Sequence, residues 1–259
     1  MKVAIITGAG SGIGLGTARK LAGAGMSIVG TGRDAEKLAE LPGAVGDAAR
    51  VATVAVDLMD EDAPRRIVAA ALERFGRIDF LINNAGVGRP KPVHEADDET
   101  LDHVLGLMLR APFRLIREVL PHLRRGAGIV NVTSTYAVIG GWRGGAYSAA
   151  KAGMTGLTQH LACQYGPQGI RSNAVAPGVI PTPMTEGRFE DETFRRMNND
   201  VTPYPRLGEV EDIASTIAFL CSPGAEFING QTIAVDGGWS STKYLSEYAL
   251  TSAWTPERP

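Results

Sequence analysis

The chain begins with KVAIITGAGSGIG at residues 2–14, where a short apolar run passes directly into a glycine-rich turn. The run predicts a strand at 2–7, and the pattern after it predicts a helix at 14–24. Glycine at such a junction lets backbone amides approach an anion at the helix N-terminus, whose dipole favours negative charge. The residues that we expect to hold a pyrophosphate are Gly8, Ser11, Gly12, Ile13 and Gly14. The spacing is G-x-x-x-G-x-G rather than G-x-G-x-x-G, so a merely tight strand-to-helix turn is the alternative.

Short apolar, β-branched runs alternate with helical patterns along nearly the whole chain. The predicted strands are 2–7, 27–31, 51–56, 78–83, 128–133, 171–176 and 231–235. The predicted helices are 14–24, 60–75, 99–124 with Pro112 interrupting it, 147–165 and 209–221. Such alternation predicts an α/β fold with a parallel sheet that helices cover on both faces.

Composition narrows the class of protein. The 259 residues are 44% hydrophobic and 21% charged, with a net charge of −2. This length suits one α/β domain over residues 1–259. The near-neutral charge argues against nucleic acid or an anionic membrane as the main partner.

The cysteines and histidines form no metal-ligand pattern. Cys163 and Cys221 lie far apart, and His94, His103, His122 and His160 are scattered, so we expect neither a disulfide framework nor a metal site. No apolar run approaches the roughly 18 residues of a membrane span. The first apolar run is too short for a signal peptide, which predicts a cytoplasmic protein.

The end of the second predicted strand bears on the choice of cofactor. It reads Gly32-Arg33-Asp34, about twenty residues after the glycine-rich turn. An acidic residue here binds adenosine ribose hydroxyls, whereas an arginine accommodates a 2′-phosphate. Because Gly32 has no side chain and Arg33 follows at once, the sequence favours NADP(H) over NAD(H). The alternative is a solvated turn in which Asp34 caps a helix.

Three further strand ends carry candidate ligand residues, because open parallel sheets bind ligands outside the carboxyl ends of their strands. Asp57 and Leu58 follow the third strand. Asn83, Asn84, Ala85 and Gly86 close the fourth, and both groups are placed for an adenine and its ribose. The loop after the sixth strand has Pro177, Gly178, Ile180 and Thr182 to offer to a nicotinamide amide or a phosphate. Ordinary turns, with an asparagine satisfying loop amides, are the alternative.

An acid/base centre is predicted in the second half of the chain. Tyr147 and Lys151 are four residues apart, so on a helix both side chains leave one face. Ser134 follows the fifth strand. The ammonium would lower the pKa of the phenol, and the hydroxyl would hold a substrate oxygen. A surface tyrosine and lysine on an amphipathic helix are the alternative.

Taken together, these motifs resemble the short-chain dehydrogenase/reductase family over about residues 1–240. They are TGxxxGxG from Thr7, NNAG from Asn83, Ser134 thirteen residues before Tyr147-x-x-x-Lys151, and the Pro-Gly loop. The resemblance implies a Rossmann-type, doubly wound, seven-stranded sheet that binds NAD(H) or NADP(H). It implies that Tyr147 is the general acid/base, that Lys151 assists it and holds the nicotinamide ribose, and that Ser134 contacts the substrate oxygen. It also implies a homo-oligomer, most simply a tetramer, with the Tyr147 helix and the last strand as interfaces.

One position departs from the family pattern. Val104-Leu105-Gly106-Leu107-Met108-Leu109 aligns with a segment in which the family usually has an asparagine, and Met108 stands in its place. A thioether is a poor hydrogen-bond partner, so it would not hold the water that links the lysine to bulk solvent. This departure puts the proton relay in question, but not cofactor binding. Met108 would instead line an apolar patch beside the substrate.

The substrate side is expected between residues 184–207, which resemble the family's lid, and the segment around Trp142. Phe189, Phe194, Met197 and Tyr204 would supply apolar contacts, and Trp142 would form a substrate wall. Packing of these aromatics within the loops is the alternative. The extension 240–259 carries Tyr244, Tyr248 and Trp254, which predicts that it docks on the protein, with a subunit boundary as one place for it.

The sequence therefore predicts an NADP(H)-dependent oxidoreductase for a ketone or secondary alcohol of small size. The same chemistry with NAD is one alternative. A sensor that binds cofactor without turnover is another, since fold alone does not prove function. A sugar epimerase or dehydratase is disfavoured, because 259 residues leave no room for a larger substrate domain.

Overall fold

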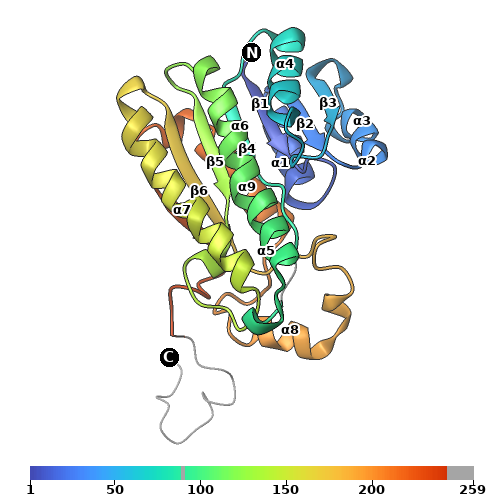
Figure 1. Ribbon diagram of the computed structural model, residues 1–259, viewed down its shortest axis with the longest axis vertical. Coiled ribbons are helices and arrows are strands. Elements are labelled where there is room, and N and C mark those ends of the chain that lie inside the picture. The colour runs from blue at the N-terminus through green and yellow to red at the C-terminus, as the bar shows by residue number, and fades with distance from the viewer. Residues whose placement is uncertain (89–90, 244–259) are drawn as a thin grey trace, which may run out of the picture.

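The computed structural model describes residues 1–88 and 91–243, and its strands form one parallel sheet. The order across the sheet is β3-β2-β1-β4-β5-β6-β7 (Figure 1). The strands are β1 (Val3–Thr7), β2 (Ser27–Gly32), β3 (Val51–Ala55), β4 (Phe80–Asn83), β5 (Gly128–Val132), β6 (Arg171–Pro177) and β7 (Thr232–Val235). The predicted seven-stranded, doubly wound α/β fold is confirmed.

Helices cover both faces of the sheet. They are α1 (Gly12–Gly23), α2 (Ala35–Ala39), α3 (Leu41–Val45), α4 (Ala63–Phe75), α5 (Asp98–Leu105), α6 (Ala111–Val119), α7 (Gly145–Tyr165), α8 (Glu192–Asn199) and α9 (Val210–Leu220). The alternation of side chains along β1 shows the two layers. Ile5 packs into the core that α4 to α7 cover, whereas Ile6 packs into the core beneath α1 and α9. Both faces are buried, which is why the inner strands are largely apolar.

The order of the strands reverses between β1 and β4. β1 pairs with β2 on one side and with β4 on the other, in parallel register through Ile5. A sheet of this kind binds ligands at the carboxyl ends of the strands that flank such a reversal. Thr7 and Asn84 join the two strand ends there: the Asn84 amide nitrogen donates to Thr7 Oγ1 at 2.9 Å, and Asn84 Nδ2 donates to the Thr7 carbonyl at 2.9 Å. The loops that carry the predicted site residues are therefore linked directly.

The predicted helix at 99–124 is the least regular part of the fold. It consists of α5, a π-helical segment at Gly106–Arg110, α6, and a 3₁₀ turn at Leu120–His122. Pro112 lies in the first turn of α6, and the irregular turn lies before it rather than at it. Proline has no N–H, and its ring clashes with the carbonyl four residues earlier, so the preceding turn widens.

Two helix caps bear on the sequence predictions, and the first belongs to a helix that was not predicted. α8 was not predicted; Asp191 caps it by accepting hydrogen bonds from the amides of Thr193 and Phe194. Asp34 caps α2 through the Lys37 amide, as the solvated-turn alternative proposed. Within the described part of the chain, no helix is both long enough and apolar enough to cross a membrane.

Candidate functional site

The glycine-rich turn after β1 leads into an uncapped helix. Ser11 is the N-cap of α1, but its side chain makes no capping hydrogen bond, and the first turn of the helix has no acidic residue. Gly8 and Gly12 have φ angles of 68° and 50°, which favour glycine. This leaves Ser11, Ile13 and the neighbouring amides at the positive end of a twelve-residue helix.

Gly14 fixes how closely the turn can pack. A Cβ atom on Gly14 would lie 2.1 Å from the Gly8 carbonyl oxygen and 2.7 Å from Asn84 Nδ2. Only glycine fits at this position, so the turn folds back tightly against the end of β4. The cradle that results fits a pyrophosphate, since its donors are backbone amides and no carboxylate opposes an anion.

The end of β2 carries both signs of charge. Arg33 Nη1 lies 3.8 Å from Asp57 Oδ2, with both side chains partly exposed. Lys37 Nζ lies 3.4 Å from Asp34 Oδ2, and the Lys37 amide donates to Asp34, which holds the Asp34 pKa below its usual value. A Cβ on Gly10 would lie 3.1 Å from Lys37 Cβ, so α2 packs against the glycine-rich turn. Arg33 is thus beside the predicted adenosine position, but its guanidinium also faces the Asp57 carboxylate.

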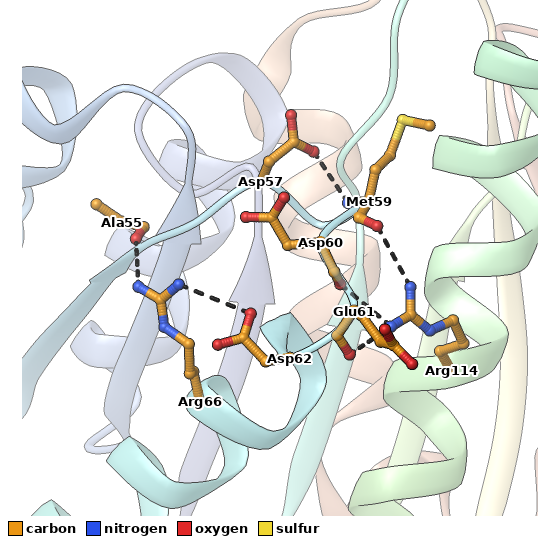
Figure 2. A network of polar contacts seen from close by, with 8 residues as sticks. All are labelled: Ala55, Asp57, Met59, Asp60, Glu61, Asp62, Arg66 and Arg114. Atoms are coloured by element: carbon orange, nitrogen blue, oxygen red, sulfur yellow. Dashed lines mark hydrogen bonds and ion pairs between the residues drawn. The ribbon is translucent and has the colours of Figure 1, made fainter.

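A network of polar contacts holds the loop after β3 in place (Figure 2). The Met59 amide donates to Asp57 Oδ1 at 2.9 Å, which turns the chain just beyond Leu58. Arg114 of α6 reaches across to this loop and donates to the backbone carbonyls of Met59, Asp60 and Glu61. The orientation of Asp57 is therefore set by the loop itself, and a helix from another part of the chain holds the residues that follow Asp57.

The loop after β6 lies against the glycine-rich turn. A Cβ on Gly12 would be 3.3 Å from Thr182 Cβ. Thr185 ties the loop together, since its Oγ1 donates to the Ile180 carbonyl at 2.8 Å and accepts from the Thr182 amide at 3.0 Å. Pro177 ends β6, and Gly178 bonds through its amide to the Val235 carbonyl at 3.1 Å. This loop is thus close to the predicted pyrophosphate position.

Ser134, Tyr147 and Lys151 lie together beyond the end of β5. Ser134 follows β5 and caps a 3₁₀ turn, and its Oγ accepts the Tyr136 amide at 3.2 Å. Tyr147 and Lys151 leave the same face of α7, with Lys151 Nζ 5.8 Å from the centre of the Tyr147 ring. Lys151 is buried, and its Nζ donates to the Val132 carbonyl at 2.8 Å.

Burial sets the protonation behaviour of this group. It lowers the pKa of Lys151 to about 8. It raises the pKa of Tyr147 above its ordinary value, opposed by a hydrogen bond to Ser134 and reinforced by Tyr136. The expected lowering of the Tyr147 pKa by Lys151 is therefore not met in the described structure, where removal from water has the larger effect. The phenol is a proton donor at neutral pH in this environment.

Met108 points into the core beside the catalytic candidates. Its side chain is 1% exposed. A Cβ on Gly86 would lie 3.1 Å from Met108 Sδ and 3.7 Å from Lys151 Nζ, so the thioether and the ammonium flank the same glycine. Ala85 donates its amide to Thr7 Oγ1 at 3.0 Å, which holds this loop over the end of β1. The thioether thus fills space near the lysine without offering it a strong hydrogen-bond acceptor.

The segment at 184–207 folds over the same end of the sheet, and α8 lies there at the lower end of the coloured ribbon in Figure 1. Phe189 and Phe194 pack against each other with ring centres 5.4 Å apart, as the loop-packing alternative proposed for the aromatics. Met197 and Tyr204 are each 57% exposed. Trp142 is 86% exposed, with Arg143 over its ring. Its predicted contact with substrate stays a prediction.

Sequence reasoning missed two features near the site. Tyr136 follows Ser134 by two residues and packs edge-on against Trp239, with ring centres 5.6 Å apart. A second feature is a buried polar chain, in which Asn83 Nδ2 donates to Asn131 Oδ1 at 2.9 Å and Asn131 Nδ2 donates to Thr158 Oγ1 at 2.8 Å. An asparagine inside an apolar strand was the available signal, because buried amides need partners.

Some expectations lie beyond these observations. Tyr244, Tyr248 and Trp254 of the extension are outside the described residues. In residues 1–88 and 91–243, no group of three or more His, Cys, Asp or Glu side chains is placed to hold a metal ion.

Comparison with known proteins agrees with this geometry. A family model described as enoyl-(acyl carrier protein) reductase matches residues 8–240. Levodione reductase of Leifsonia aquatica is 40% identical over 257 residues, covering 93% of this chain and 94% of the relative. Cis-4-hydroxycyclohexanecarboxylate dehydrogenase of Sinomonas cyclohexanicum is 40% identical over 244 residues, covering 93% and 97%.

A solved structure gives the same answer for the fold. The crystal structure of 3-ketoacyl-(acyl-carrier-protein) reductase from Brucella melitensis complexed with NADH superposes with a TM-score of 0.84 at 35% identity, covering 92% of this chain and 98% of that one. The chain belongs to the short-chain dehydrogenase/reductase family. It is accordingly an NAD(P)-dependent oxidoreductase that acts on CH–OH groups.

Proposed function

We propose that the protein is an NADP(H)-dependent oxidoreductase that interconverts a ketone and a secondary alcohol. The observation that carries the proposal is the convergence of Ser134, Tyr147 and Lys151 beyond the end of β5, beside a glycine cradle that fits a pyrophosphate. A nicotinamide bound there would supply or accept the hydride. The experiment is turnover of a panel of ketones and secondary alcohols with both cofactors, and absence of turnover with all of them contradicts the proposal.

The side chains divide the work of proton transfer. In the reductive direction, the Ser134 hydroxyl donates a hydrogen bond to the substrate oxygen, and the Tyr147 phenol delivers the proton to it. The raised pKa of Tyr147, caused first by burial, keeps the phenol protonated and ready to donate. Lys151 lies against the same ring and can replace the proton after each cycle. The lowered Lys151 pKa of about 8 makes such a transfer accessible near neutral pH.

The remaining predicted cofactor residues keep their roles in this proposal. Gly8, Ser11, Gly12, Ile13 and Gly14 bind the pyrophosphate. Asp57, Leu58, Asn84, Ala85 and Gly86 surround the adenosine and its ribose, and Pro177, Gly178, Ile180 and Thr182 face the nicotinamide side. Support comes from the contacts of Thr7 with Asn84 and the approach of Thr182 to Gly12, which bring the three loops to one place.

A cyclic ketone or its alcohol is the proposed substrate class. The two relatives reported above are named for levodione and for cis-4-hydroxycyclohexanecarboxylate, both of which carry a six-membered ring. The side chains of Trp142 and Met184 offer apolar surface for such a ring, since they are 86% and 44% exposed. Met108, 1% exposed, would support this surface from beneath.

Arg33 is the basis for proposing NADP(H). A guanidinium binds a phosphate through paired hydrogen bonds, and Gly32 brings no carboxylate to repel it. We expect NADPH to bind more tightly than NADH in fluorescence titrations, and Arg33→Ala to weaken NADPH selectively. Arg50→Ala is a matched control, because Arg50 is also partly exposed and paired with an aspartate, Asp47, at 2.9 Å. Tighter NADH binding would refute the preference.

Preference for NAD(H) is the second candidate, and one contact favours it. Arg33 already faces Asp57 at 3.8 Å, so a 2′-phosphate would have to compete with a carboxylate for the same guanidinium. Asp57→Asn separates the two proposals. It should tighten NADPH binding if Arg33 contacts the phosphate, and should leave the ratio of the two affinities unchanged if it does not.

A homo-oligomer, most simply a tetramer, is proposed with α7 and β7 as interfaces. β7 pairs with β6 through one edge, and an open edge strand is a surface that proteins usually cover. Ala152 and Gly156 are exposed on α7, and a Cβ on Gly156 would meet nothing within 4 Å. We expect Gly156→Glu to reduce the mass measured by light scattering. A monomeric wild type at micromolar concentration would refute the assembly.

The proposed location is the cytoplasm. Cys163 is exposed and Cys221 is buried, and both are free thiols. Persistence of an exposed free thiol suits a reducing compartment. Fractionation of cells that produce the protein tests the location, and recovery in a membrane or external fraction would contradict it.

A further inference from the structure

The helix that carries Tyr147, α7, begins without a cap of its own. Gly144 is its N-cap residue, with a φ of 86° and no side chain to accept a hydrogen bond from the first turn. The bond that closes this turn runs from the Ser148 amide to the Gly144 carbonyl at 2.9 Å. Tyr147 is the third residue of α7, so the phenol stands in a turn that its own sequence leaves uncapped.

The loop that precedes α5 holds this helix end from outside. The Gly144 amide donates to the carbonyl oxygen of Lys91 at 2.9 Å, which joins the two segments beside the N-terminal end of α7 (Figure 1). A Cβ atom on Gly145 would lie 2.7 Å from Val93 Cγ2, so the Val93 side chain rests on the backbone of the first residue of α7. The contact is possible only because residue 145 is glycine. The start of α7 is therefore placed by a distant segment of the chain.

Lys91 is itself fixed by its side chain. Its Nζ lies 3.3 Å from Asp97 Oδ2 and donates to Thr100 Oγ1 at 3.2 Å. Asp97 is the N-cap of α5 and accepts the Thr100 amide at 2.7 Å. Thr100 is 4% exposed, so the ammonium is anchored on a buried hydroxyl as well as on a carboxylate. One residue thus links the cap of α5, through its ammonium, to the start of α7, through its carbonyl.

The Asp97 carboxylate keeps its charge at any working pH. Hydrogen bonds from Thr100, followed by one from Lys91, lower its pKa to about 2. The ion pair is nevertheless partly exposed on both sides, and pairs of this kind contribute little to the stability of a whole protein. Its effect is therefore local, and consists in where it holds the backbone of Lys91.

We propose that Lys91 is a positioning residue for Tyr147, which it holds in place through the Gly144 amide at the start of α7. The inference rests on the proposed function, since it takes Tyr147 as the proton donor. Lys91 takes no part in hydride or proton transfer. It keeps the first turn of α7 ordered, so that the phenol remains in the orientation from which it can donate.

Kinetics on the best ketone test this link. Lys91→Met removes the ammonium and keeps the apolar part of the side chain. We expect kcat to fall by roughly three- to tenfold, the change in population that follows the loss of an ordinary helix cap, while the Kd of the cofactor and the KM of the ketone stay nearly unchanged. Lys91→Arg should recover most of kcat, because a guanidinium can also bind Asp97 and Thr100. A wild-type kcat in Lys91→Met would overturn the proposal.

Lys20→Met is the matched control for the loss of a paired surface lysine. Lys20 is 43% exposed and paired with Glu211, and Lys91 is 44% exposed and paired with Asp97. The Lys20 variant should keep the wild-type kcat. Equal losses in the two variants would mean that Lys91 has no particular link to the helix of Tyr147.

A double-mutant cycle separates placement of the phenol from general damage. If Lys91 acts through Tyr147, Lys91→Met should cost nothing further in a Tyr147→Phe background, where no phenolic hydroxyl remains to be placed. The same loss factor in both backgrounds would show that the lysine acts on something else, and the proposal would fall.

The glycine at the start of α7 offers a second variant that leaves Lys91 intact. Gly145→Ala should lower kcat even though alanine favours a helix, because its methyl group would displace Val93 and with it the loop. Val93→Ala in the same chain makes room for that methyl group and should restore kcat. A Gly145→Ala variant with the wild-type kcat would contradict the placement of α7 by this loop.

Hydrogen exchange keeps this inference separate from the proposed function. Exchange of the amides at 144–148, followed by mass spectrometry without substrate, reports the order of the first turn directly. Faster exchange in Lys91→Met, with no change in Lys20→Met, supports the positioning role even if Tyr147 proves not to be the proton donor. Unchanged exchange, together with turnover that depends on Tyr147, keeps the proposed function and rejects the role of Lys91.

Discussion

Lys151 Nζ donates a hydrogen bond of 2.8 Å to the carbonyl oxygen of Val132, the last residue of β5. The bond fixes a buried amine between the end of a strand and the phenol on its own helix. A carbonyl oxygen is a favourable partner for an ammonium, but it does not restore the water that burial removes. The position of Lys151 is thus well determined, and keeping its amine charged in this buried place costs free energy.

The first prediction separates catalysis from binding. Tyr147→Phe keeps the ring and removes the hydroxyl, so it should lower turnover by roughly 10²–10⁴-fold while leaving cofactor affinity nearly unchanged. Lys151→Ala should reduce both, because the ammonium is placed for the phenol and for the cofactor ribose. Steady-state kinetics and fluorescence titration measure the two effects. A Tyr147→Phe variant with the wild-type rate on the best substrate would show that another group supplies the proton.

The second prediction concerns the pH dependence of stability. The pKa of Lys151 is about 8 in the folded protein, lowered by burial from 10.5. Between these values the unfolded chain binds more protons than the folded one, so the contribution of Lys151 to the free energy of unfolding rises with pH. Below pH 8 its contribution is unfavourable and constant.

Denaturation at pH 7, 8, 9 and 10 tests this directly. The free energy of unfolding of the wild type, minus that of Lys151→Met, should be flat up to about pH 8 and then rise. Tyr147 has a raised pKa and would act in the opposite direction above its ordinary value of 10.0, so the series stops there. Parallel curves for the two proteins would mean that Lys151 keeps an ordinary pKa when folded.

The third prediction uses two glycines of α1. Gly14→Ala would put a methyl group 2.1 Å from the Gly8 carbonyl oxygen and 2.7 Å from Asn84 Nδ2, and the Gly8 backbone cannot move aside as a flexible side chain could. We expect a loss of about 1–3 kcal/mol in the free energy of unfolding, and weaker cofactor binding. Gly23→Ala is the control, since nothing lies within 4 Å of its Cβ position. It should stabilise the helix by up to about 1 kcal/mol. Similar effects at both positions would contradict the cradle.

The fourth prediction addresses the methionine beside Lys151. Met108→Asn should change kcat by less than about tenfold, which is about 1.4 kcal/mol of barrier. The reason is that a proton needs only a path from Tyr147, which Lys151 can offer, whereas an amide placed in this apolar pocket costs roughly 1–3 kcal/mol if unpaired. Stopped-flow and steady-state kinetics measure the change. A gain of several orders of magnitude, or a wild type that binds cofactor and turns over nothing, would favour the sensor alternative.

Local patterns were sufficient for much of the fold and for the positions of Ser134, Tyr147 and Lys151 along it. Strands and glycines have strong signals, because a buried strand is apolar and a cradle tolerates no Cβ. The direction of the Tyr147 pKa was not accessible, since it depends on how much water the surrounding helices remove. The packing of Tyr136 was missed for a related reason: its ring lies against Trp239, which is remote from it in sequence.

The π-helical segment Gly106–Arg110 makes the number of residues in this helix matter as much as their identity. The Ala111 amide bonds to the Gly106 carbonyl, five residues earlier, so the segment holds one residue more than an α-helix of the same length. Deleting one residue here would restore regular winding over the same length, so that α5 and α6 would keep their faces and only the side chains of the segment would change direction. Position 108 would then no longer face Gly86 and Lys151. The widened turn thus sets the direction of the side chain at position 108, which lies beside Gly86 and Lys151.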